Sequence, residues 1–133
     1  MKKKDSRIQI YDNVFSHTFR TKLYEKIINA DYNIGWADTK IIENSDKVFM
    51  YSLWNIEQCI KSGILSNIHN KDIVEKINKR LPTRCVVNCG TFSDVYIPHS
   101  HDNVDVFLYY ANLDWKPEWN GETGFYSEDL NTL

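Results

Sequence analysis

Two of the four histidines stand two residues apart, at His99 and His101. On an extended segment, side chains two positions apart lie on the same face, so both imidazoles can reach one metal ion while Ser100 points the other way. Neutral imidazole binds Fe, Zn, Ni and Cu, and the carboxylate of Asp102 or Asp105 would add an oxygen ligand. The spacing therefore indicates a metal site, and the alternative interpretation is a polar turn before the next strand.

A second stretch of interest, residues 115–123, follows the aromatic run that contains Tyr109 and Tyr110. Together with the segment around His99, it resembles the iron- and 2-oxoglutarate-dependent dioxygenases, particularly their prolyl-4-hydroxylase-like branch. The residues that match the family's motifs are Tyr96, Pro98 and His99 in the first, Tyr109, Tyr110 and Asn112 in the strand that follows, and Gly121, Glu122 and Thr123 in the loop after it. The specific motifs cover only this part of the chain, although the order of predicted elements is similar over most of it.

The resemblance implies an oxygenase that binds Fe(II), 2-oxoglutarate and O2, with ascorbate as a further possible cofactor, and that hydroxylates an unactivated C–H bond. It also implies that Tyr96 contacts 2-oxoglutarate and that His99 is the first iron ligand. The family usually has an acidic residue two positions after that histidine, whereas this chain has His101 there and Asp102 one place later. Either His101 is the second ligand, which we favour, or a bulge turns Asp102 inward.

In the family, later strands carry a distal histidine ligand and a basic residue that pairs with the far carboxylate of 2-oxoglutarate. Beyond Glu122 the sequence contains no His, Arg or Lys, so the resemblance implies the front part of an oxygenase, with an incomplete site and little or no turnover. Arg84 begins a predicted strand far along the chain from His99, and we do not expect it to replace the missing cation. The substrate is chosen by loops that vary freely on such a scaffold.

Two other classes of function fit part of the same pattern. The first is a cupin-like metal protein, because His99, His101 and Asp105 approximate the cupin pattern of two histidines followed by an acidic residue. The cupin glycine is misplaced here and the second cupin motif is missing. The other is a metal-free remnant or binding module that keeps the sheet and has no catalysis. A histidine and then a basic residue on strand-like segments after Leu133 would favour the oxygenase.

Length and composition indicate one globular domain over residues 1–133. A chain of this length buries roughly two thirds of its unfolded surface around a single core, and its 42% hydrophobic residues are ordinary for a globular protein. The net charge of −2 offers no electrostatic footprint for nucleic acid, and no apolar stretch reaches the length of a membrane helix. Three cysteines without a CxxC pair indicate reduced thiols, and we expect a cytoplasmic protein.

Residues 1–82 are predicted to be rich in helix. After an extended lead-in over residues 7–15, Ser16 is the expected N-cap of a helix that ends near residues 29–31. Apolar side chains at four-residue spacing predict one buried stripe on this helix. The residues of that stripe are Phe19, Leu23 and Ile27.

The rest of this part alternates loop, strand and helix. We expect a polar loop over residues 33–46, a strand over residues 48–53, and a helix within residues 55–68 that Gly63 weakens. A clearer helix over residues 72–81 ends before a proline, which prevents its continuation. The side chains expected to be buried are Ile56, Ile60 and Ile64 on the first of these helices and Ile73, Ile77 and Leu81 on the second.

Residues 83–133 are predicted to be rich in short strands. These are expected over residues 84–88, 95–98 and 105–110, followed by a long loop over residues 112–121. We therefore predict an α+β fold in which the N-terminal helices pack on one side of an antiparallel sheet. The resemblance implies that this sheet is part of a jelly roll, or double-stranded β-helix, whose barrel is incomplete. Such a barrel exposes a sheet edge and apolar inner-face residues such as Phe107 or Tyr109, so we expect a homo-oligomer.

Overall fold

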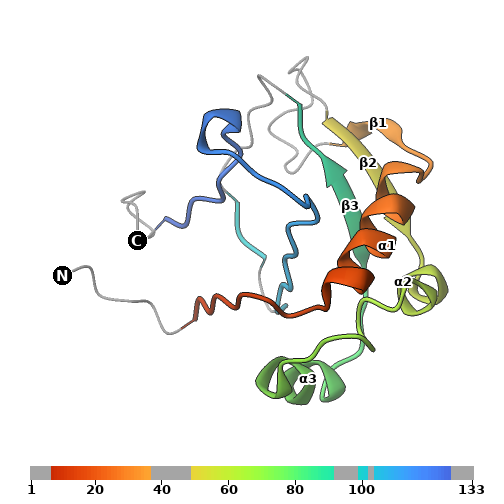
Figure 1. Cartoon of the computed structure of the whole chain (residues 1–133), viewed down its shortest axis with the longest axis vertical. Helices are drawn as coiled ribbons and strands as arrows, with labels where there is room; N and C mark the ends of the chain where they lie inside the picture. Colours follow the sequence, from red (N-terminus) through yellow and green to blue (C-terminus); the bar gives the residue numbers. More distant parts are fainter. Residues whose placement is uncertain (1–6, 37–48, 92–98, 102–103, 127–133) are drawn as a thin grey trace.

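The computed structural model describes residues 7–36, 49–91, 99–101 and 104–126 of the 133-residue chain. Within them the chain forms three α-helices, three strands and a short 3-10 turn over Pro117–Trp119 (Figure 1). In chain order, the helices and strands are α1 (His17–Ile28), β1 (Asn33–Trp36), β2 (Phe49–Trp54), α2 (Ile56–Ser62), α3 (Lys71–Asn78) and β3 (Cys85–Cys89). The described part of the chain is therefore an α+β fold, as predicted.

The three strands form one antiparallel sheet in the order β1-β2-β3. β2 lies in the middle, and its Ser52 and Trp54 stand directly opposite Val87 and Cys85 of β3. Directly opposed residues project from the same face of an antiparallel sheet, so these four side chains share one face. That face is covered, because Ser52 and Trp54 are buried, whereas Leu53 on the opposite face is 53% exposed.

β2 and β3 confirm the strands predicted over residues 48–53 and 84–88, each moved by one residue toward the C-terminus. β1 is a strand where the sequence predicts a polar loop, so that prediction is wrong for residues 33–36. Its pairing with β2 is interrupted by a bulge at Gly35, whose φ of +120° favours glycine. Pairing with a neighbouring strand, rather than local propensity, makes this segment a strand.

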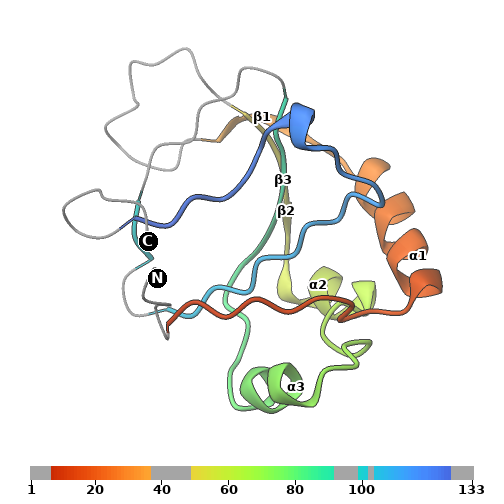
Figure 2. The same cartoon turned by 60° about the vertical axis from the view of Figure 1, so that its left-hand side comes forward.

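α1 and α2 lie on one side of the sheet, and residues 99–101 and 121–126 lie on the other (Figures 1 and 2). α1 begins as predicted, because the Ser16 side chain accepts a hydrogen bond from the backbone N–H of Phe19. Leu23, in the middle of the predicted stripe, is only 2% exposed. None of the described helices is long and apolar enough to cross a membrane.

α2 is shorter than predicted and buries a different side. Asn55 caps its start, and Gly63, with a φ of +79°, ends it. Cys59 is the buried residue of α2, at 3% exposed, whereas Ile56 and Ile60 are exposed and the prediction that they are buried is wrong. The short connection from β2 sets the rotation of this helix against the sheet, and local periodicity does not contain that information.

α3 is the helix predicted over residues 72–81, but it ends three residues early, at Asn78. Ile73 is buried on it, as predicted. Leu81 is 89% exposed and lies beyond the helix, so its assignment to the buried side is wrong. The residue before a proline is disfavoured in helical conformation, which explains why Leu81 cannot extend α3 toward Pro82.

A core cluster joins segments that are far apart in the sequence. Phe15, from the lead-in before α1, contacts Tyr109 edge-on with ring centroids 4.9 Å apart. The backbone N–H of His69 donates a hydrogen bond to the Val14 carbonyl at 2.8 Å. The buried members of the cluster are Val14, Phe15, Ile68 and Ile73. The lead-in is therefore part of the core, and it positions the start of α1.

The strand predicted over residues 105–110 is wrong, because residues 104–110 form neither helix nor strand. They pair with none of the strands in the described part of the chain, and a strand without a partner leaves its backbone groups unpaired. Phe107 is exposed, as expected, while Tyr109 is partly buried in the core cluster. The strand predicted over residues 95–98 lies outside the described residues.

Candidate functional site

His99 and His101 lie in a short described stretch between β3 and the coil that starts at Val104. Their Nε2 atoms are 3.1 Å apart, and the two rings meet at an angle of 75° with centroids 4.8 Å apart. Both side chains are exposed. The imidazoles therefore converge on one point that solvent can reach, which is what the two-residue spacing predicts.

The distance between the two Nε2 atoms suits a shared metal ion. With metal–nitrogen distances of about 2.1 Å and an angle of about 90° at the ion, two adjacent ligand nitrogens stand about 3.0 Å apart. The same separation suits a hydrogen bond in which the neutral tautomer of one ring donates Nε2–H to the other ring. An ion at about 2.1 Å from both nitrogens would lie about 1.4 Å off the line that joins them, so the separation allows either a shared ion or the hydrogen bond.

The other predicted site residues do not join the histidines. Tyr96 and Asp102 lie outside the described residues. Asp105, which is a candidate oxygen ligand and the acidic residue of the cupin pattern, instead accepts a hydrogen bond from Arg80 in a solvent-exposed ion pair. Among the residues that the structure describes, no third His, Cys, Asp or Glu groups with the two imidazoles to form a metal site.

Two of the residues that match the family motifs after the histidines, Tyr110 and Thr123, are in contact. The Tyr110 hydroxyl donates a hydrogen bond to Thr123, so the run after the histidines contacts the end of the predicted loop. Within that loop, Trp115 Nε1 donates to the Asn120 carbonyl at 3.2 Å. Asn120 and Gly121 have positive φ angles of 55° and 93°, which turn the chain at this point. The loop is therefore held by a contact between Trp115 and Asn120, and the chain after it contacts Tyr110.

The coil that follows the histidines is also held by the helical part of the molecule. Arg20 of α1 donates a hydrogen bond to the Leu113 carbonyl at 3.2 Å, and Tyr109 packs against Phe15. The Tyr109 hydroxyl is buried and has no hydrogen-bond partner within the described residues. Side-chain contacts, rather than a β-ladder, thus position the coil next to the candidate site.

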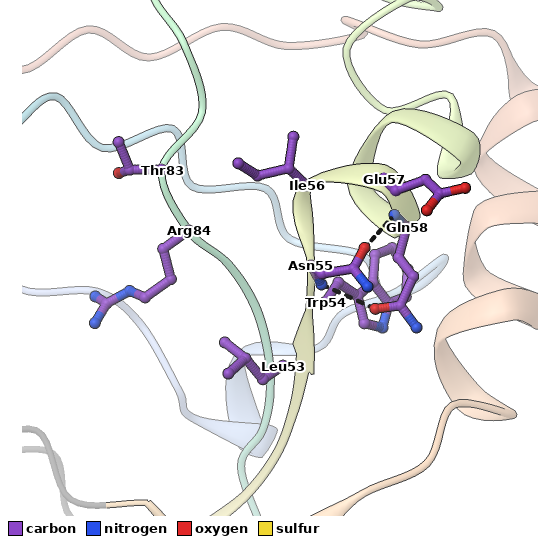
Figure 3. A pocket seen from close by; sticks show the side chains of 8 residues that line it. All are labelled: Leu53, Trp54, Asn55, Ile56, Glu57, Gln58, Thr83 and Arg84. Carbon is purple, nitrogen blue, oxygen red and sulfur yellow. Dashed lines mark hydrogen bonds between the residues drawn. The ribbon is translucent and has the colours of Figure 1, made fainter.

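A second feature, which the sequence analysis missed, is an open hollow of about 730 Å³ where β2 passes into α2 (Figure 3). Leu53 and Ile56 extend toward the chain at Thr83 and Arg84, which forms the opposite wall. The hollow thus combines apolar side chains with a guanidinium group. The sequence gives little sign of this hollow, because the two segments that line it are about thirty residues apart in the chain. Only Arg84 is distinctive, as the single arginine of residues 83–133.

Two exposed imidazoles at the separation of adjacent metal ligands are the clearest chemical arrangement in the described part of the chain. They stand on a segment without regular secondary structure, next to a coil that Phe15 and Arg20 hold in place. No protein-family model, curated protein sequence or solved structure matches this chain.

Proposed function

We propose that this chain is a domain of the Fe(II)- and 2-oxoglutarate-dependent oxygenase class, with the metal held by His99 and His101. The observation that supports the proposal is the 3.1 Å separation of the two Nε2 atoms. Imidazole nitrogens at this separation can occupy adjacent positions on one divalent ion. The resemblance of residues 96–125 to the dioxygenase motifs is the reason to expect iron as that ion.

The proposed architecture is part of a jelly roll with its outer helices. α1 and α2 lie on one side of the sheet, and residues 99–101 lie on the other side (Figure 2). In this proposal, the metal site faces the side of the sheet that α1 and α2 leave open. Leu53 is exposed on that open face and is available to line a substrate cavity.

When bound, Fe(II) with 2-oxoglutarate and O2 supplies the oxidising chemistry that hydroxylates a C–H bond. His99 and His101 hold the ion through Nε2, which leaves each Nδ1 for a hydrogen bond that orients the ring. In this proposal Tyr96 contacts 2-oxoglutarate and Asp102 is the alternative second ligand. Because two protein ligands leave most coordination positions to small molecules, we expect weak metal binding and low turnover.

Metal binding is the first test, because it does not depend on turnover. Anaerobic calorimetry with Fe(II), repeated with Co(II) in air, should show one site in the wild-type chain. Replacing His99 or His101 with alanine should weaken binding by more than about 100-fold, since even groups that only orient a ligand contribute about 10- to 100-fold. His69→Ala is the matched control, because His69 is exposed and lies in the helical part. Equal affinity of H99A and the wild type would contradict the site.

The variant Asp102→Asn decides between the two candidates for the second ligand. If His101 is the ligand, D102N binds Co(II) as the wild type does and H101A does not. The reverse result would assign the role to Asp102. Succinate formation from 2-oxoglutarate, with Fe(II), ascorbate and O2, then tests the reaction class. Because the site is incomplete, we expect little succinate; succinate that disappears in H99A supports an oxygenase, whereas succinate that H99A forms as well as the wild type would contradict the assigned site.

A further inference from the structure

A second, smaller hollow, of about 360 Å³, is lined by the end of α1, by β2 and by the start of α2. Most of the side chains that line it are polar. Ser52 and Trp54 of β2 line it from the covered face of the sheet, whereas residues 99–101 lie on the other side (Figure 2). The hollow therefore belongs to a different part of the molecule from the candidate metal site.

Two opposite charges line this hollow without neutralising each other. Lys26, in the last turn of α1, holds its ammonium group 5.4 Å from the centroid of the Trp54 ring, whose face attracts a cation. Asp31 follows the end of α1 and is exposed. Within the described part of the chain, neither charged side chain takes part in an ion pair. The hollow therefore presents one cation and one anion to a molecule that enters it.

Two amide side chains at the hollow are oriented by hydrogen bonds of their own. The Asn29 amide nitrogen donates to the Glu25 carbonyl at 2.8 Å, which leaves Oδ1 of Asn29 as an acceptor. Oε1 of Gln58 accepts from the backbone N–H of Asn55 at 2.8 Å, which leaves Nε2 of Gln58 as a donor (Figure 3). The end of α1 thus supplies an acceptor close in the chain to the Asp31 carboxylate, and α2 supplies a donor.

We propose that this hollow binds a free α-amino acid as a zwitterion. The ammonium group of the ligand donates to the Asp31 carboxylate and to Oδ1 of Asn29. The carboxylate of the ligand accepts from the Lys26 ammonium group and from Nε2 of Gln58. The C-terminal end of α1 carries a partial negative charge, which also favours the ammonium group on that side. This proposal does not depend on the metal site or on the reaction class proposed above.

Size and charge both favour this class of ligand. Sites for small molecules have volumes of about 300–1,000 Å³, so a hollow of about 360 Å³ suits a molecule as small as an amino acid. A ligand with a single charge leaves the opposite charge of the hollow without a partner and lies near a charge of its own sign. Because the Trp54 ring is only 7% exposed, little of its face is available to stack on a sugar. A zwitterion pairs with both charges and needs no stacking.

The test is isothermal titration calorimetry of the folded wild-type chain with each of the standard L-amino acids at millimolar concentration. We expect at least one of them to bind at a single saturable site. Its N-acetyl derivative lacks the ammonium group and its α-amide lacks the carboxylate. Each derivative should bind about tenfold more weakly or worse, which is the effect of losing a hydrogen bond between charged groups. Equal binding of either derivative, no binding of any amino acid, or binding of glucose in their place would overturn the proposal.

Variants that remove one charge test where the ligand lies. Lys26→Met and Asp31→Asn should each weaken binding of the amino acid by about tenfold or more. The α-amide should bind K26M and the wild type alike, since it has no carboxylate for Lys26 to pair with. Lys71→Met and Asp72→Asn are the matched controls, because both residues are exposed on α3 and neither lines the hollow. Wild-type affinity in either K26M or D31N would overturn the proposal.

Discussion

The helix and sheet part of the molecule and the coil of residues 104–126 contain similar side chains but differ in structure. Phe49–Trp54 and residues 104–110 are both apolar and rich in aromatic residues, yet only the first run is a strand. β2 pairs on both sides, with β1 and β3, whereas residues 104–110 pair with no strand of the described chain. Strand propensity therefore produces a strand only where a neighbour supplies the hydrogen bonds.

Side-chain burial follows the same division. Leu23 of α1 is fully buried, while Leu108 of the coil is 55% exposed. In the coil, Tyr109 is the side chain that packs against the core cluster. His99 and His101 stand next to this coil, so the candidate chemistry lies in the region with little regular structure, and the helices and sheet act as its scaffold.

Matched leucine truncations in the two regions should give the largest effect. Leu23→Ala removes a buried side chain and leaves a cavity, so the free energy of unfolding should fall by about 3–4 kcal/mol. Leu108→Ala removes an exposed side chain and should change it by less than about 0.5 kcal/mol. Urea unfolding followed by circular dichroism measures both. Similar losses in the two variants would show that the coil is packed as tightly as α1, contrary to the comparison.

Tyr109→Phe should have a smaller effect, in the opposite direction. Its hydroxyl is buried without a hydrogen-bond partner in the described part of the chain, so removing the oxygen should raise the free energy of unfolding by about 1 kcal/mol. Tyr110→Phe is the control, because the exposed Tyr110 hydroxyl donates to Thr123 and its loss should be neutral or slightly destabilising. A clear loss of stability in Y109F would mean that this hydroxyl has a partner and that the coil is held more firmly than its described contacts indicate.

Asp105→Asn should give the smallest effect, although it breaks a contact between the two regions. The Arg80–Asp105 pair is solvent-exposed, so its loss should lower the free energy of unfolding by less than about 1 kcal/mol. About 1 M salt should remove most of the difference between D105N and the wild type. Glu75→Gln, which breaks the exposed pair with Lys79, is a control of similar size. A loss above about 2 kcal/mol in thermal unfolding would show that the coil depends on this one ion pair.

The sequence by itself determined the features whose signals are local. The N-cap Ser16 and the four-residue spacing of apolar side chains around Leu23 predict the position of α1. Both signals depend only on residues within or next to this one helix. The spacing of His99 and His101 brings their rings together, since alternation along an extended chain needs no distant partner. The strands β2 and β3 were predictable from their composition, to within one residue.

Only the tertiary structure decided the features that depend on which segments become neighbours. Residues 33–36 form a strand because β2 pairs with them, and residues 104–110 do not form one because no described strand does. The packing of α2 against the sheet buries Cys59, and the fold brings Asp105 into an ion pair with Arg80. Each of these contacts joins residues that are far apart in the chain. Their free energy comes from pairing and desolvation between segments, which local patterns of residue type do not contain.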